Sequence, residues 1–196
     1  MVKIHSSRIE KRFTAAQYLA SEDKSVNKHE FFNGKIIKMP GASHQHNQIA
    51  ANIITGLNLA LDDVAENFIV YSSDMKIHIP RFNHFVYPDA VVICEEPVLY
   101  AGRTDTILNP VLVVEVLSAS TSHHDRGNKF LQYQTLSSFK EYLLVAQDQV
   151  EVTRFFCGDG QNWEKIVVTN LEGFIELKSL KILMPLKRIY NRVKLG

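Results

Sequence analysis

The chain of 196 residues lacks the sequence features that mark several classes of protein. It has only two cysteines, Cys94 and Cys157, in separate apolar segments without CxxC spacing, which favours buried reduced thiols over a metal site or a disulfide. No uninterrupted apolar run approaches the roughly 18 residues of a membrane span. Residues 1–12 carry charges where a signal peptide needs an apolar stretch. We therefore expect a cytoplasmic protein with no membrane partner.

An excess of either charge is also missing. Lysines and arginines number 22 against 21 acidic residues, so the net charge is +1 and no global field draws the protein toward nucleic acid or anionic lipid. Any such binding must be local. The acid-free stretch 177–196 is one local candidate, as a phosphate-contacting rim or simply as a solvated face. Its basic residues are Lys178, Lys181, Lys187, Arg188, Arg192 and Lys194.

Long linkers and repeats are absent as well. The nine glycines and six prolines form no segment able to separate two domains, and no stretch repeats or is of low complexity. Hydrophobic residues at 45% and charged residues at 22% are close to globular averages. We predict a single domain over residues 1–196.

The pattern of apolar residues predicts interleaved strands and helices. Two of the strands are apolar on both faces, which favours an α/β sandwich around a central mixed β-sheet over a barrel or a bundle. The expected helices are 14–23, 43–62 and 125–136, with a short one from Pro185; the expected strands are a hairpin over 30–39 around Asn33-Gly34, then 75–79, 86–94, 111–117, 142–146, 150–156 and 164–168.

Two acidic residues stand where these strands should be apolar. In residues 111–117, a period of two puts Glu115 on one face with Val113 and Leu117. Asp89 follows Pro88 and would share a face with Val91 and Ile93 in the strand over 86–94. A buried carboxylate costs several kcal/mol unless it is paired or bound to a metal. Each acid therefore marks either a salt bridge at a strand end or a functional cleft.

A cation for these acids is found on the next helix. Lys129 lies on the helical stripe with Tyr133 and Leu136 and should face the sheet. Asp125, one turn earlier, could instead pair with Lys129 along the helix, a purely structural arrangement. The spacing alone does not decide whether Lys129 pairs with the acids of the strands or with Asp125.

The ordered set of these residues resembles the PD-(D/E)XK nucleases, in the variant whose lysine has moved to the helix after the second acid. Leu117, two positions after Glu115, leaves that role to Lys129. The chain is more specifically similar to the Uma-two-type restriction endonuclease family, over roughly residues 14–150. The matching positions are Glu30, Gly34, His46, Pro88-Asp89, Glu115-Val116-Leu117-Ser118, Asp125, Lys129, Tyr133 and Glu141-Tyr142.

This resemblance implies a restriction-endonuclease-like fold and a metal-dependent DNA endonuclease. It implies that Asp89, Glu115 and the backbone carbonyl of Val116 hold Mg²⁺, for which Mn²⁺ would substitute. Lys129 would orient the attacking water, and Glu30 would position a water or a second ion. Further residues would line the substrate cleft or contact phosphate. These are His46, Tyr133 and Ser118.

Other readings remain beside this one. The chain could be a nucleic-acid-binding module on an inactivated nuclease fold, or it could hydrolyse a small phosphate-containing molecule. His46 could be a partly buried histidine at a helix start, and a zinc site at the paired histidines is disfavoured because no further ligand has suitable spacing. DNA is the expected partner, and a homodimer would supply two sites for two strands.

Overall fold

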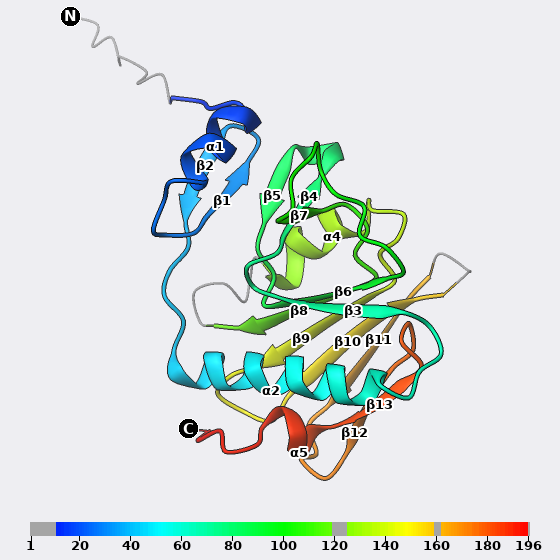
Figure 1. The fold of residues 1–196 in the computed structure, drawn as a ribbon. Coiled ribbons are helices and arrows are strands. Elements are labelled where there is room, and N and C mark those ends of the chain that lie inside the picture. Colours follow the sequence, from blue (N-terminus) through cyan, green and yellow to red (C-terminus); the bar gives the residue numbers. More distant parts are fainter. Residues whose placement is uncertain (1–10, 119–124, 159–161, 196) are drawn as a thin grey trace, which may run out of the picture.

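The computed structural model describes residues 11–118, 125–158 and 162–195. Figure 1 shows their arrangement. In chain order the elements are α1 (Ala15–Glu22), β1 (His29–Phe32), β2 (Lys35–Lys38), α2 (His44–Leu61), β3 (Phe68–Ser72), β4 (Lys76–Ile79), η1 (Pro80–Phe82), β5 (His84–Val86), β6 (Ala90–Cys94), β7 (Thr106–Ile107), β8 (Leu112–Leu117), η2 (Asp125–Lys129), α4 (Phe130–Tyr133), β9 (Glu141–Ala146), β10 (Val152–Cys157), β11 (Trp163–Val168), β12 (Phe174–Leu177), β13 (Ile182–Pro185) and α5 (Leu186–Ile189). Within these ranges no helix is long and apolar enough to cross a membrane.

Two β-sheets form the frame of the molecule. The larger has six strands in the order β11-β10-β9-β8-β6-β3, and β8 and β9 at its centre run parallel while their other neighbours run antiparallel. The smaller has five strands in the order β2-β1-β5-β4-β7. Strands β12 and β13 form a separate antiparallel pair. The predicted mixed sheet flanked by helices is confirmed.

The larger sheet lies between two apolar layers (Figure 1). On one face α2 packs through Ile49, Ile53 and Leu57, all fully buried, against alternate residues of the central strands. On the other face the strands β4 and β5 and the helix α4 pack against the remaining alternate residues, among them Val113 and Leu117. The central strands are therefore buried on both faces, as their continuous apolar runs predict.

The helix starts follow from their capping residues. The Thr14 side chain accepts a hydrogen bond from the backbone of Gln17, whose own side chain accepts from the Thr14 backbone, a complete capping box. The Ser43 hydroxyl accepts from the backbone of His46 and caps α2. This cap fixes where the first turn of α2 begins and so where His46 lies.

The single strand expected over residues 86–94 is wrong. The chain forms β5 in the smaller sheet and β6 in the larger one, separated at Pro88 and Asp89. Pro88 has no N–H to donate to a ladder, so the break falls there, and the Asp89 backbone then donates to the carbonyl of Val114 on β8 at 3.1 Å. Asp89 consequently lies before the strand begins, at the boundary of the two sheets.

Other expectations also need correction. The expected strands do not include β3, β7, β12 and β13. β7 has only two residues, and β12 and β13 have four each, so the alternate burial of β12 and β13 is too short to stand out in the sequence. Both cysteines are free, as expected, but they are half-buried rather than buried.

Half of the six basic side chains in residues 177–196 are already paired. Three of them pair with acids from other parts of the chain, which the local sequence cannot show. Such exposed pairs contribute little stability, but they occupy the charges that a phosphate would need. The pairs are Lys178–Glu164, Lys181–Glu66 and Lys187–Glu172.

An aromatic cluster in the smaller sheet encloses a histidine. The His78 ring stacks on Phe85, with centroids 4.3 Å apart, and meets the Tyr100 ring edge-on at 4.5 Å. Its Nδ1 atom has no hydrogen-bond partner among the described residues. Burial, assisted by the nearby His84, lowers the pKa of His78 to about 4. The imidazole is therefore neutral at pH 7.

This histidine predicts a pH dependence of stability. Between pH 6.5 and 4 the unfolded chain binds a proton at this position that the folded chain excludes, so stability should fall as the pH drops through this window. We expect a loss of about 2 kcal/mol at pH 5. Chemical denaturation of His78→Phe should lack this loss, whereas the exposed control His44→Gln should keep it. An unchanged pH profile in His78→Phe would contradict the prediction.

Candidate active site

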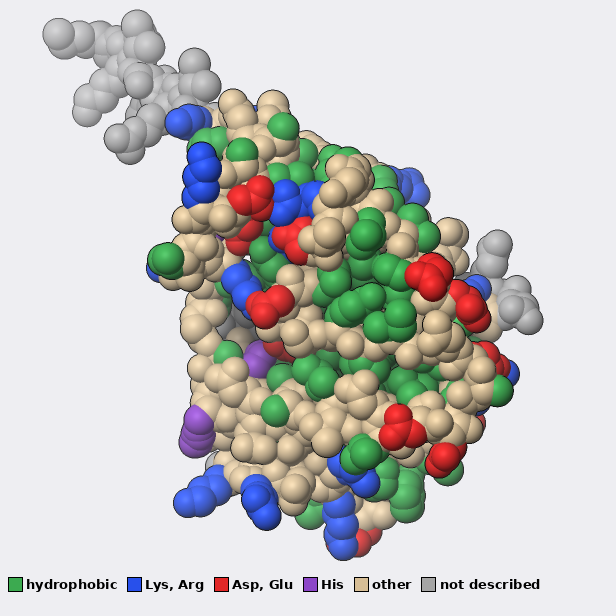
Figure 2. Space-filling view, in the orientation of Figure 1, with side chains coloured by type: hydrophobic (Ala, Val, Ile, Leu, Met, Phe, Trp, Pro, Cys, Tyr) green, Lys and Arg blue, Asp and Glu red, His purple; other side chains and the backbone are tan. Residues whose placement is uncertain are grey.

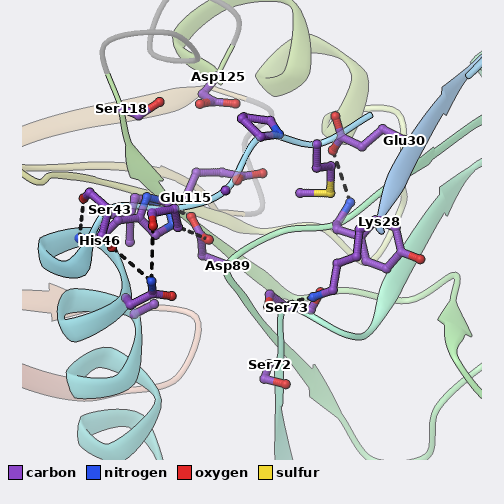
Figure 3. Close-up of a pocket in the computed structure, with 18 of the residues that line it drawn as sticks. Lys28, Glu30, Ser43, His46, Ser72, Ser73, Asp89, Glu115, Ser118 and Asp125 are labelled. Carbon is purple, nitrogen blue, oxygen red and sulfur yellow. Dashed lines mark hydrogen bonds and ion pairs between the residues drawn. The ribbon is translucent and has the colours of Figure 1, made fainter. Parts of the chain in front are cut away.

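Acidic side chains from separate elements converge on one cavity. It has a volume of about 840 Å³ and lies between α2, the β1–β2 hairpin and the ends of β8 and η2. Figure 3 shows Glu30, Asp89, Glu115 and Asp125 around this space. The predicted residues Glu30, Asp89, Glu115, Val116, Ser118, Lys129 and His46 all line it. The cavity therefore brings together positions that are scattered from the first strand to η2.

Lys129 lies at the centre of the acids. Its Nζ is 2.8 Å from Glu115 Oε1, 3.3 Å from Glu30 Oε1 and 3.7 Å from Asp125 Oδ1. Lys129 is 4% exposed and Glu115 is 5% exposed. The expectation that Lys129 faces the sheet is confirmed, and the pairing with Asp125 along the helix occurs together with the pairing to Glu115 rather than in place of it.

Asp89 is held by two donors. Its Oδ1 is 2.7 Å from His46 Nε2, and its Oδ2 accepts a hydrogen bond of 2.7 Å from the backbone N–H of Val116. The contact with His46 was not foreseen. With a strict period of two, Asp89 would point to the side of the larger sheet where β4 and β5 pack. Asp89 lies outside the strand, however, so the alternation does not apply to it. Its side chain meets α2 on the opposite side of the sheet. No local spacing joins these two residues, 43 positions apart.

The site carries more negative than positive charge. Burial, with help from Asp125 and Asp89 and against the attraction of Lys129, raises the pKa of Glu115 well above its ordinary value. Burial alone would lower the pKa of Lys129, but Glu115, Glu30 and Asp125 together raise it well above its usual range. Both shifts favour the protonated form, because protons relieve the surplus of carboxylates. A bound cation would relieve it in the same way.

Tyr133 and Glu30 are positioned by further hydrogen bonds. Tyr133 is fully buried and donates from its hydroxyl to Glu115 Oε1 at 3.2 Å, so it lies behind that carboxylate and off the cavity wall. Burial and the neighbouring Glu115 raise its pKa well above the ordinary range. Glu30 Oε1 accepts from the Tyr87 backbone N–H at 3.2 Å. The two contacts help to hold these carboxylates in place, from Tyr133 outside the cavity and from Tyr87 on its wall.

Glu141 belongs to the matching motif but not to the site. It is fully buried at the start of β9 and accepts hydrogen bonds from the Lys178 and Ser179 backbone N–H groups and from the Ser179 hydroxyl. Its Oε1 is 3.8 Å from Arg154 Nε. These contacts give Glu141 a structural role, tying β9 to the turn between β12 and β13. Its neighbour Tyr142 does reach the site region, with its hydroxyl donating to the Asp125 carbonyl.

The donor set suits a hard divalent cation. Carboxylate and carbonyl oxygens are the ligands of Mg²⁺ and Mn²⁺, and the surplus of negative charge gives a cation a favourable place. No group of three such side chains among the described residues already has the spacing of a metal site. Asp89 and Glu115 are turned toward His46, Val116 and Lys129 instead, so ion binding requires these side chains to reorient.

Comparisons with known proteins agree with this geometry. A family model named Uma2 and described as "Putative restriction endonuclease" matches residues 15–184. Two uncharacterised proteins of Synechocystis sp. strain PCC 6803 are similar: sll1609 is 34% identical over 88% of this chain and 96% of its own length, and slr1290 is 33% identical over 92% of each. A crystal structure from Anabaena variabilis, described as "a putative nuclease belonging to DUF820", matches with a TM-score of 0.72 and 16% identity over 93% of this chain and 99% of that one. The fold is therefore restriction-endonuclease-like.

Proposed function

The chain belongs to the Uma2 family, and from that premise we propose that it is a metal-dependent DNA endonuclease which hydrolyses phosphodiester bonds. The observation that carries the proposal is the cluster of Glu30, Glu115 and Asp125 around the buried ammonium of Lys129, beside Asp89 in one cavity. Glu115 and Lys129 are both almost fully buried, where an unbalanced charge costs more than it does at the surface. The surplus of carboxylates supports a site built for a cation.

Asp89, Glu115 and the Val116 carbonyl would hold the ion, Mg²⁺ or Mn²⁺. When bound, such an ion lowers the pKa of water and offsets the charge that develops on the phosphate. The Val116 backbone already contacts Asp89 through its N–H, so the proposed ligands lie next to one another. This proposal treats residues 1–196 as one domain.

Lys129 would act on the water and the phosphate. The ammonium has three donors, and the acids around it hold it protonated, so it can donate to the attacking water and to a phosphate oxygen as charge builds there. The water oxygen bonds to phosphorus, the bond to the leaving oxygen breaks, and that oxygen takes up a proton. Glu30 would position the water, and His46 and Ser118 would lie close to the phosphate. Tyr133 would hold Glu115.

A direct test is cleavage of DNA by the purified chain. With Mn²⁺ or Mg²⁺ we expect nicking or cutting of at least one of single-stranded, supercoiled, linear and branched DNA, and none in EDTA. Cutting both strands of a duplex would need two sites, which a homodimer would supply. If DNA binds in a salt-dependent way but no substrate is cut with either metal, the chain is a binding module on an inactivated nuclease fold.

Metal binding gives a second test that is independent of activity. Asp89→Ala should weaken Mn²⁺ binding by at least about 10-fold in calorimetry, the size found when ligand or supporting contacts of a metal site are removed. Asp148→Ala, at an exposed acid that does not line the cavity, is the matched control and should bind as the original chain does. Equal Mn²⁺ affinity in Asp89→Ala and the original chain would refute the assigned ligand.

A further inference from the structure

A short connecting segment bridges the mouth of the cavity. Met39–Ser43, called the strap here, joins β2 to α2 and lines the cavity along its length. One end is tied by the Met39 N–H, which donates to the Lys28 carbonyl at 2.9 Å. The other is tied by the Ser43 hydroxyl, which donates to Gln147 Oε1 at 2.7 Å, and by the Asn47 amide, which donates to the Ser43 carbonyl at 3.0 Å. The strap is thus anchored at both ends.

The reactive groups lie deep beneath this mouth. Asp125 is 3% exposed, and Glu115 and Lys129 are almost as enclosed. The cavity volume of about 840 Å³ falls within the range of roughly 300–1,000 Å³ that is typical of pockets enclosing small ligands. A strand whose phosphate reaches Lys129 must therefore enter the cavity without a second strand beside it. A base-paired duplex cannot meet this condition, because its second strand would have to enter as well.

Among the described residues, the charge around the mouth does not suit the outside of a long duplex. Apart from Lys129, the described lysines that line the cavity are Lys28 and Lys38, and Lys28 is 2.6 Å from Asp74. On the face shown in Figure 2, lysine and arginine side chains are scattered rather than gathered around the hollow at its edge. Duplex binding through many phosphates would need a basic stripe of that kind.

The walls of the cavity have the mixed character that an unpaired nucleotide needs. Ala50 and Ile54 of α2 and, on the strap, Met39 present apolar surface on which a base can lie. Beside them, the side-chain carbonyl of Asn47 and the NH₂ group of Gln147 can bond to base edges, while the other amide atoms of these two residues hold the strap. A paired base in a duplex has its faces and its pairing edge covered and could not use these contacts.

We propose that the substrate of this site is a single strand, with an unpaired nucleotide seated between the strap and α2 and its phosphate at Lys129. This inference rests on the proposed nuclease function and narrows it to single-stranded DNA, free ends and flaps. The strap admits one strand and excludes the second. The small net charge of +1 is consistent with this, because a short strand held inside a cavity needs few phosphate contacts outside it.

The experiment compares one labelled oligonucleotide as a single strand, as a blunt duplex and as the flap of a duplex. With Mn²⁺, the single strand and the flap should be cut at least ten-fold faster than the duplex. In Ca²⁺, which the same oxygen ligands accept, the single strand should also bind at least ten-fold more tightly, measured by fluorescence anisotropy. Duplex cleavage as fast as single-strand cleavage would overturn the inference and leave the nuclease proposal standing.

Matched variants test the seat of the nucleotide. Ala42→Trp fills the strap side of the mouth and Ala50→Phe fills the α2 side, whereas Ala51→Phe changes an exposed neighbour that does not line the cavity. The first two should lose at least ten-fold in single-strand affinity with an unchanged melting temperature, and the control should lose none. Because Ala42 is exposed, Ala42→Trp should still fold and can be measured even if Ala50→Phe misfolds.

The two proposals fail in different ways. If no DNA is cut with either metal, the nuclease proposal falls, and the binding data alone decide whether the cavity takes a single strand. Single-strand binding that is no tighter than duplex binding, or that both filled variants retain, would overturn the inference.

Discussion

Lys129→Ala should lower the rate of DNA cleavage by at least about 100-fold while Mn²⁺ still binds, because a buried donor to developing charge is worth that much in turnover. The lysine contacts Glu115, Glu30 and Asp125, and its removal leaves those acids available to a cation. Metal affinity should therefore stay level or rise. The measurements are single-turnover cleavage and calorimetry on the same preparation.

The controls for this result separate chemistry from folding. Lys129→Met keeps most of the side-chain volume and should show the same loss of turnover, so a packing defect cannot account for it. Lys140→Ala removes an exposed lysine at the end of the neighbouring turn and should cut DNA at the original rate. Undiminished cleavage by Lys129→Ala would leave the fold in place but refute the proposed role of the lysine.

Glu115→Gln should abolish cleavage yet leave the metal-free protein at least as stable as the original chain. Burial and the nearby acids raise the pKa of Glu115, so its ionised form costs stability at pH 7, and a neutral amide removes that cost. A gain on the order of 1 kcal/mol is expected. The stabilisation of the original chain by saturating Mn²⁺, about 2.7 kcal/mol at 100 times the dissociation constant, should disappear. Thermal denaturation in EDTA and in Mn²⁺ measures both effects.

Glu141→Gln is the matched comparison, because Glu141 is just as buried but is bonded on all sides by the protein. A glutamine at this position would place its NH₂ group against groups that already donate to Glu141. We therefore expect the free energy of unfolding to fall by about 1–3 kcal/mol. If Glu115→Gln lost stability in EDTA as Glu141→Gln does, Glu115 would be a structural ion-pair partner rather than part of a cation site.

The positions that depend on one element were predictable from the sequence. The period of two in residues 111–117 placed Glu115 on the same face as Val113 and Leu117, and the helical stripe placed Lys129 toward the sheet, where it meets Glu115. The contact between His46 and Asp89 was not predictable, since it depends on where the first turn of α2 meets the boundary of the two sheets. The split at Pro88 followed a visible signal, but which sheet each half would join is decided by pairing with distant strands.

The parallel pairing of β8 with β9 has a consequence for how the protein matures. The chain must leave β8, pass through η2 and α4 and return alongside β8, so this crossover closes only after a long loop has been ordered. Glu115 lies on the first strand of the crossover and Lys129 on its connecting segment. A newly made chain with this crossover still open keeps acid and ammonium apart. The cluster of acids around Lys129 should therefore form only when this crossover closes during folding.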